Sequence, residues 1–146
     1  MAINMDDNQK FEALMARYRD QVELMRALTK IDLQVFSGFI TLQIVVVGWL
    51  LEHPIEECVL KSGSAIIDLT LTLVAVVLLT NNYFRRKETK RTLDNVMTAL
   101  RFDEPDFYSL GQPLNPKYTF RPWLPFYLTA VIATFVVVLL ALFVRP

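Results

Sequence analysis

One acidic side chain lies inside a long apolar stretch of this sequence. Asp68 is the single charged residue in the run from about residue 65 to 83. An ionisable group inside a membrane segment costs at least a few kcal/mol unless it is paired or hydrated, so it is a functional candidate by default. Small and polar side chains share its helix face: Ala65, Thr72, Ala75 and Asn82. Two interpretations stay open, a carboxylate that caps or snorkels at the helix N-terminus and an inward-facing group in a pore or proton relay.

Polar residues also interrupt an earlier apolar run, from about 33 to 51, which contains Gln34, Ser37, Thr41 and Gln43. At steps of three and four, one helix face collects Gln34, Gly38, Thr41, Val45 and Gly48. Small residues on one face let helix backbones approach closely, and a buried amide can hydrogen-bond across the contact. The spacing therefore predicts helix packing at Gly38 and Gly48, and at Ala75 in the later run.

The remaining reactive side chains predict no catalytic or metal site. The chain has one cysteine and one histidine, so an intrachain disulfide and a haem held by two of its own histidines are excluded. His53, Glu57 and Cys58 lie close in sequence, but they are too few and too unspecific for a zinc site. No HExxH, GxSxG or Gly-rich phosphate loop occurs. We expect no enzyme activity and no cofactor.

The elements that carry these residues are predicted to be membrane helices. Hydrophobic residues make up 53% of the 146 and gather into three blocks. The last block, from Trp123 to Val144, has no charge over about 22 residues, and a bilayer-spanning helix needs about 20. Trp123, Phe126 and Tyr127 stand at its start, as expected at a headgroup boundary. The composition predicts an all-α polytopic membrane protein with three spans, 33–51, 65–83 and 123–146.

Two further helices are predicted outside the spans. Apolar residues from Phe11 to Leu28 follow helical spacing, and no Gly or Pro occurs between Met5 and Ser37, so one helix should enter the first span without a break. After the second span, an apolar stripe continues to about residue 102 behind the densest basic cluster: Arg85, Arg86, Lys87, Lys90 and Arg91. Beside a membrane span, such a cluster favours cytoplasmic retention and contact with anionic lipid headgroups over nucleic-acid binding.

Charge asymmetry predicts the topology. The regions 1–32 and 85–122 contain most of the Lys and Arg, whereas the connection 52–64 has only Lys61 against three glutamates. The positive-inside rule then gives a cytoplasmic N-terminus, an extracytoplasmic 52–64 loop, a cytoplasmic second connection and an extracytoplasmic C-terminus. The domains expected are the cytoplasmic amphipathic helix 1–32, the hairpin 33–84, the basic helix with its Pro-rich aromatic loop 85–122, and the third span. A bacterial inner membrane is the expected location.

The arrangement resembles SLATT-type bacterial membrane proteins, in which a charged N-terminal helix precedes a hairpin of two spans and a basic helix. The resemblance covers about two-thirds of the chain, with YRDQVELMRALTKIDLQ at 18–34, the two spans, and NNYFRRKETKRTLDNVMTAL at 81–100. The third span lies outside this pattern. The resemblance implies a self-associating membrane effector, with pore formation in antiphage or conflict systems as the role to expect.

Two functions of different class follow from these features. The first is a homo-oligomer that associates through helices 10–32 and 84–102, with the first two spans facing one another around an ion or solute path. The second is a non-conducting accessory or anchoring subunit of a larger membrane complex, favoured by the wholly apolar middle of the second span, 73–79. A peripheral lipid or nucleic-acid binder acting through the 85–91 cluster ranks below both.

Overall fold

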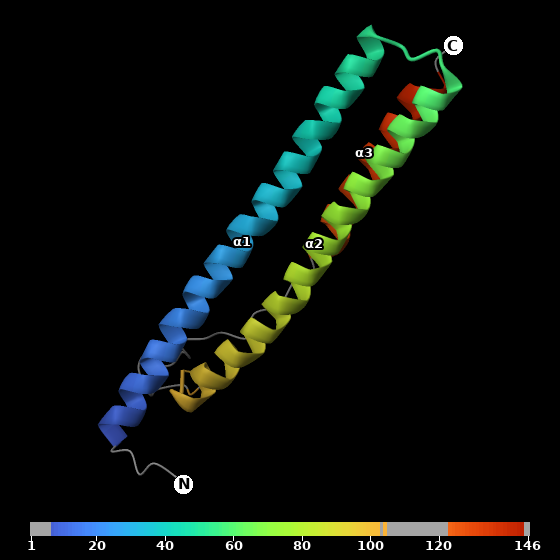
Figure 1. The fold of residues 1–146 in the computed structure, drawn as a ribbon. Coiled ribbons are helices and arrows are strands. Elements are labelled where there is room, and N and C mark those ends of the chain that lie inside the picture. The colour runs from blue at the N-terminus through green and yellow to red at the C-terminus, as the bar shows by residue number, and fades with distance from the viewer. Residues whose placement is uncertain (1–6, 103, 105–122, 145–146) are drawn as a thin grey trace. The chain divides into compact units, whose positions relative to one another are not determined.

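A computed structural model describes residues 7–102, 104 and 123–144 of the chain. These ranges are helical or irregular and contain no β-strand. The helices are α1 (Asp7–Glu52), α2 (Cys58–Ala99) and α3 (Leu124–Phe143), coloured in chain order in Figure 1. Each is long and apolar enough to cross a membrane. The prediction of an all-α chain with three apolar helices is therefore confirmed, and the three helices indicate a multi-pass membrane protein.

Helix α1 is continuous over 46 residues. Its interior lacks proline, and its glycines first appear at Gly38, so nothing in its first 30 residues interrupts the backbone hydrogen-bond ladder. The helix ends at Glu52, just before Pro54, as expected because the residue before a proline is disfavoured in the helical region. The predicted uninterrupted passage from the N-terminal helix into the first apolar run is present.

Helix α2 begins earlier than the sequence predicts. We expect a connection over 52–64 with Gly63 and Ser64 opening the next helix, but α2 starts at Cys58 and only 53–57 separate the two helices. Gly63 and Ser64 therefore lie in the second turn of α2. A single glycine costs a helix interior about 1 kcal/mol relative to alanine, which the long apolar helix that follows tolerates.

The C-terminal end of α2 forms a hydrogen-bonded cap. The amide of Phe102 donates to the carbonyl of Met97 (3.0 Å), and the amide of Arg101 donates to that of Thr98 (3.0 Å). Arg101 has φ = 61°, in the left-handed region. This is the Schellman arrangement, in which a left-handed residue after the helix pairs the last free carbonyls. The predicted Pro-rich loop from 103 onward lies mostly outside the described residues.

The chain divides into two compact units, and each contains parts of α1 and α2. The first, the charged unit, comprises 1–29 and 84–121; the second, the apolar unit, comprises 30–83 and 122–146. In the charged unit, Leu28, Val96 and Leu100 are buried, and the Tyr18 ring packs edge-on against Phe102 with centroids 5.8 Å apart. The apolar stripe of the N-terminal helix thus has a partner inside the chain.

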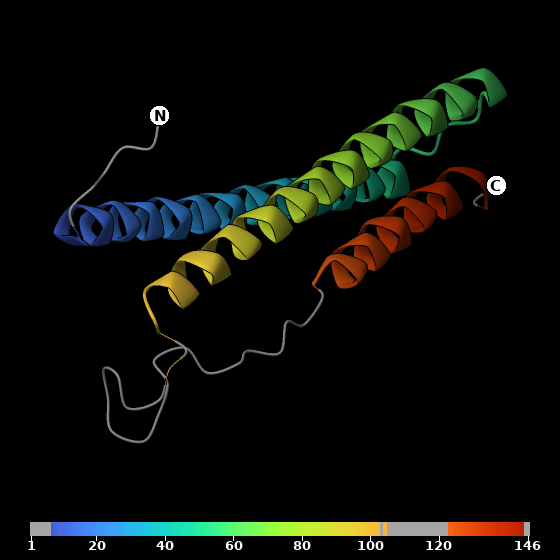
Figure 2. The ribbon, with the colours of Figure 1, turned by 90° about the horizontal axis from the view of Figure 1, so that it is seen from below.

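The apolar unit contains three helices. Figures 1 and 2 show α3 beside the parts of α1 and α2 that lie near the 53–57 connection. One cluster of buried side chains joins Phe39, Ala75, Leu79 and Val131; a second joins Leu50, Val138 and Leu142. Each cluster takes residues from more than one helix, so burial in this unit depends on α3 as well as on the α1–α2 pair.

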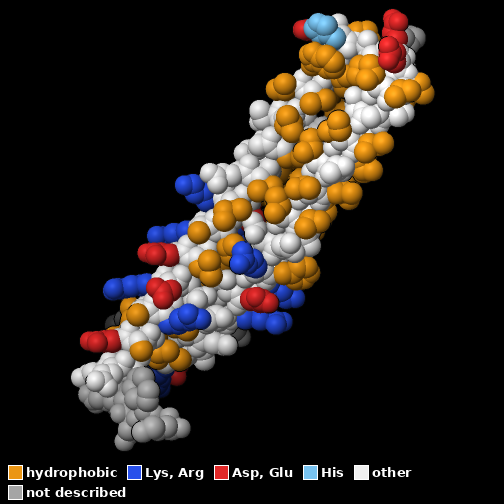
Figure 3. Space-filling view, viewed as in Figure 1, with side chains coloured by type: hydrophobic (Ala, Val, Ile, Leu, Met, Phe, Trp, Pro, Cys, Tyr) orange, Lys and Arg blue, Asp and Glu red, His pale blue; other side chains and the backbone are white. Residues whose placement is uncertain are grey.

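Most apolar side chains of this unit point outward. In the most apolar 18-residue stretch of each helix, only 17% (α1), 22% (α2) and 17% (α3) is buried inside the chain. Figure 3 shows hydrophobic side chains over this unit and Lys, Arg, Asp and Glu side chains over the charged unit. Soluble monomers rarely expose apolar patches above a few hundred Å², so this surface is typical of helices that face lipid.

Candidate functional site

A buried hydrogen bond joins α1 and α2 in the middle of the apolar unit. The side-chain amide of Gln43 donates from Nε2 to Oδ1 of Asp68 over 2.6 Å. Gln43 is 1% exposed and Asp68 is 6% exposed. Asp68 lies ten residues into α2, about three turns from its first residue, so it does not cap the helix N-terminus. The Asp68 side chain therefore faces the other helices of its own unit.

The helix face around Asp68 is buried as its spacing predicts. Thr72, Ala75 and Leu79 follow Asp68 on that face, and all three are buried. Thr72 donates its hydroxyl to the backbone carbonyl of Asp68 (2.8 Å), so this hydroxyl is used within its own helix. Asn82, at the end of the face, is half-buried.

The Gln43–Asp68 pair is short of hydrogen-bond donors. Among the described residues, none donates to Oδ2 of Asp68 or to Oε1 of Gln43, although both atoms are buried. Both are acceptor oxygens when the carboxylate is ionised, so neither can satisfy the other. A buried polar atom without a partner costs about 1–3 kcal/mol.

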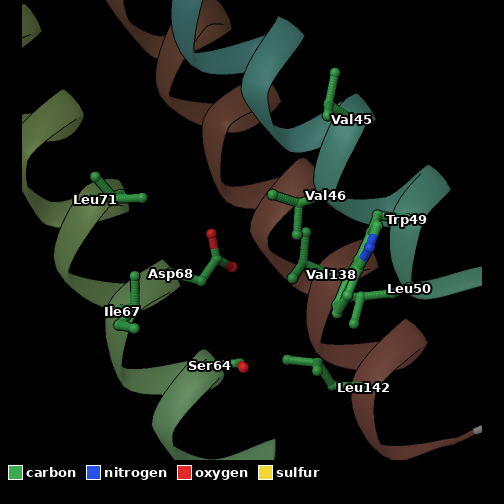
Figure 4. A pocket seen from close by; sticks show the side chains of 10 residues that line it. All are labelled: Val45, Val46, Trp49, Leu50, Ser64, Ile67, Asp68, Leu71, Val138 and Leu142. Atoms are coloured by element: carbon green, nitrogen blue, oxygen red, sulfur yellow. The ribbon is translucent and has the colours of Figure 1, made fainter. Parts of the chain in front are cut away.

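Asp68 borders a cavity of about 340 Å³. Figure 4 shows its carboxylate pointing from α2 toward Val46 and Val138, on α1 and α3. The other lining residues come from all three helices: Val45, Trp49, Leu50, Ser64, Ile67, Leu71 and Leu142. Val45, Ile67 and Trp49 are more than half exposed, at 62%, 64% and 52%, and so form its mouth on the outer surface of the unit. Apart from Asp68 and Ser64, the walls are apolar or aromatic.

The predicted packing stripe of α1 lies on the outside of the chain. Gln34, Gly38, Thr41 and Gly48 are all exposed. A Cβ added at Gly38 or Gly48 would meet no atom within 4 Å, so no other helix of the described chain approaches these glycines. The α1 face that does pack inward is offset from it and contains Phe39, Gln43 and Leu50.

The basic cluster lies within the charged unit. Arg85, Lys87 and Arg91 are exposed, whereas Arg86 and Lys90 are half-buried. Arg86 donates from Nη2 to the Thr29 hydroxyl of α1 (3.0 Å). Two members of the cluster are therefore partly buried within the protein, and the other three side chains are exposed.

No part of the described chain brings metal ligands together, including the 53–57 connection between α1 and α2. His53 stacks on Trp49 with ring centroids 5.6 Å apart, and Cys58 is exposed at the start of α2. No group of three or more His, Cys, Asp or Glu side chains within residues 7–102, 104 and 123–144 could hold a metal ion.

Three buried polar residues were not singled out from the sequence: Gln21, Asp32 and Thr89. Asp32 is 2% exposed and directly precedes the first apolar run, where an acid is expected to reach water. A signal was present nevertheless. Gln21 and Leu28 are seven residues apart on one face of α1, Asp32 is one further turn along that face, and all three are buried.

No protein-family model matches this chain, and no curated protein and no solved structure matches it either. The resemblance to SLATT-type proteins therefore stays a prediction from the sequence.

Proposed function

We propose that this chain is an integral protein of a bacterial inner membrane that works as a homo-oligomer, with a pore formed along the outer face of α1. The observation that carries the proposal is the exposure of Gln34, Gly38, Thr41 and Gly48 on the apolar part of α1. In hydrocarbon an amide or hydroxyl gains from a partner, and small residues permit close helix approach. A second copy of α1 offers both.

In this proposal the two helices have different roles. Asp68 faces Gln43 within one chain, so the wall of a path between chains would come from the α1 stripe. The outer face of α2 is apolar, with Leu73, Val74, Val77 and Leu78 exposed, and suits contact with lipid.

The apolar outer face of α2 and the small number of polar side chains on the α1 stripe support the second candidate, a non-conducting accessory subunit. Thr41 and Gln34 are the only amide or hydroxyl side chains on the α1 stripe, which is few for a conducting path. In this alternative the stripe of α1 packs against a different membrane protein.

The mass of the purified protein in detergent, measured by light scattering, tests the assembly. Gly38→Leu and Gly48→Leu should each lower the mass toward that of one chain, because a leucine side chain prevents close approach of a second helix. Both glycines are exposed, and a Cβ added at either meets no atom of the chain within 4 Å. Gly63→Leu is the matched control: Gly63 is also in open space, but on α2 away from the stripe. All three changes raise helix propensity similarly, so propensity cannot account for a difference.

Ion flux from liposomes separates the two candidates. A conducting oligomer should release trapped ions, and the two stripe variants should abolish the release while Gly63→Leu retains it. A wild-type oligomer without flux would favour the accessory subunit. A monomeric wild type would overturn the homo-oligomer.

A further inference from the structure

The Asp68 cavity combines one unpaired carboxylate oxygen with apolar walls. Gln43 holds Oδ1 at 2.6 Å, which fixes the carboxylate, while Oδ2 has no donor among the described residues. Ser64, one turn before Asp68 on α2, also lines the cavity, and Figure 4 shows its oxygen on the same side. A ligand with N–H or O–H donors would supply the missing donor to Oδ2 of Asp68 and would also donate to the Ser64 hydroxyl oxygen.

The dimensions and walls of the cavity limit what that species can be. An apolar cavity of about 150 Å³ is enough to bind benzene, so about 340 Å³ has room for an aromatic ring with a short polar arm. A bare metal ion is a poor fit, because hard cations take about six or more oxygen ligands and this cavity offers one carboxylate and one hydroxyl. Apolar walls favour an ion that has an apolar body.

From this geometry we infer that the cavity beside Asp68 binds a small organic ammonium ion with an apolar or aromatic body. The ammonium group donates to Oδ2 of Asp68 and to the Ser64 hydroxyl, and the body fills the space between Val46, Leu71 and Val138. An ammonium carries three donors, and the site offers it two acceptors, Oδ2 of Asp68 and the Ser64 hydroxyl. The aromatic wall provided by Trp49 adds attraction for a cation.

The position of the mouth indicates the route of entry. Val45, Ile67 and Trp49 are exposed on the apolar surface of the unit, so a ligand would arrive from the bilayer side. Amphiphilic amines partition into that region. The site belongs to a single three-helix unit and does not depend on the proposed oligomer.

Calorimetric titration of the full-length protein in detergent with benzylammonium tests the inference. Benzyl alcohol serves as the neutral ligand of similar size, and empty micelles provide the blank. We expect saturable binding of one benzylammonium per chain and weaker binding of the alcohol. Asp68→Asn should weaken benzylammonium binding roughly tenfold or more, since hydrogen bonds to charged groups contribute about 1.5–3 kcal/mol. The alcohol should bind this variant as before.

Two further variants make the test specific. Asp94→Asn removes a carboxylate at an exposed position of the same helix and should bind like the wild type. Leu71→Phe, on the partly exposed cavity wall, should weaken both ligands by occupying their space. Asn keeps an acceptor for Gln43, so Asp68→Asn should fold, as circular dichroism will verify; if it does not, Leu71→Phe alone carries the test.

Equal benzylammonium affinity in wild type and Asp68→Asn would overturn the inference and leave Asp68 as a structural or proton-binding group. Absence of saturable binding to the wild type would overturn it as well. Neither result bears on the mass of the oligomer, so the two proposals fail separately.

Discussion

At the scale of single residues, the Gln43–Asp68 hydrogen bond is the feature that sets this chain apart from a plain membrane anchor. The sequence was sufficient to select Asp68 and its buried face, because an acid among apolar residues is conspicuous and helical spacing identifies its neighbours. It was not sufficient to select Gln43 as the partner. Which face of α1 turns inward depends on packing with α2 and α3. The stripe with Gln34 and Thr41 has polar side chains as well, and from the sequence it is as good a candidate for burial as the face of Gln43.

Removing one member of the pair should cost more than removing both. Gln43→Leu leaves the Asp68 carboxylate buried without a donor, and Asp68→Leu leaves the Gln43 amide unpaired, so each should lower the free energy of unfolding by about 1–3 kcal/mol. The double variant Gln43→Leu/Asp68→Leu should recover much of this loss, because apolar groups can replace both partners at little cost.

Thermal unfolding in detergent, followed by circular dichroism, measures this cycle. Asn95→Leu provides a control at an exposed amide of α2, where the change should stay within about 0.5 kcal/mol. Additive losses in the double variant would show that the two side chains do not stabilise one another.

At the scale of elements, the apolar spans and their continuity with the flanking helices could be predicted, whereas the start of α2 could not. Length and hydropathy define a span over about 20 residues. The absence of Pro from α1, and of Gly before Gly38, explains why the helix is unbroken. Glycine and serine at 63–64 indicate a turn by local preference. Local preference is weak beside the hydrogen bonds and burial that a 42-residue helix gains, and the helix extends through them to Cys58.

Gly63 therefore provides a direct test of the helix start. Gly63→Ala should stabilise α2 by up to about 1 kcal/mol, since alanine is the better helix former and its Cβ meets no atom within 4 Å. The unfolding midpoint in detergent measures the gain. Ser62→Ala, on a neighbouring exposed position whose hydroxyl bonds to the carbonyl of Cys58, provides the comparison. A loss of stability in Gly63→Ala would mean that Gly63 adopts a turn conformation that alanine cannot.

At the scale of the whole molecule, the structure separates a charged unit from an apolar unit. The segregated charges of the sequence predict boundaries between cytoplasmic and membrane regions at 32 and 84, and the two units meet at 29–30 and 83–84. The sequence also predicts that helices 10–32 and 84–102 associate between copies. Within the charged unit these helices pack against each other, with Val96 and Leu100 buried, so their apolar stripes do not require a second chain. Amphipathic spacing shows that a partner is needed but not which partner.

The distribution of charge around the two units predicts the topology. The charged unit holds the N-terminal basic residues and the 85–91 cluster, whereas the turn 53–57 holds Glu56 and Glu57 and no Lys or Arg. Positive charge is retained on the cytoplasmic side, so the charged unit should be cytoplasmic and the turn extracytoplasmic. Lys61 lies within α2, so a reporter inserted there would interrupt a helix, and the turn is the better position.

Reporter fusions measure this topology in cells. A phosphatase that is active only outside the cytoplasm should be active when inserted after Glu56 or fused after Arg145, and inactive when fused after Gln112. A fluorescent protein that matures only inside should give the opposite results at the same three positions.

Replacing Arg85, Arg86 and Lys87 with glutamate should weaken the retention signal and produce mixed orientations, whereas the same change at the lone Lys61 should not. An active phosphatase at Gln112 in the unaltered chain would reverse the assignment, and with it the prediction that α1 and α2 enter the membrane as a hairpin from the cytoplasmic side.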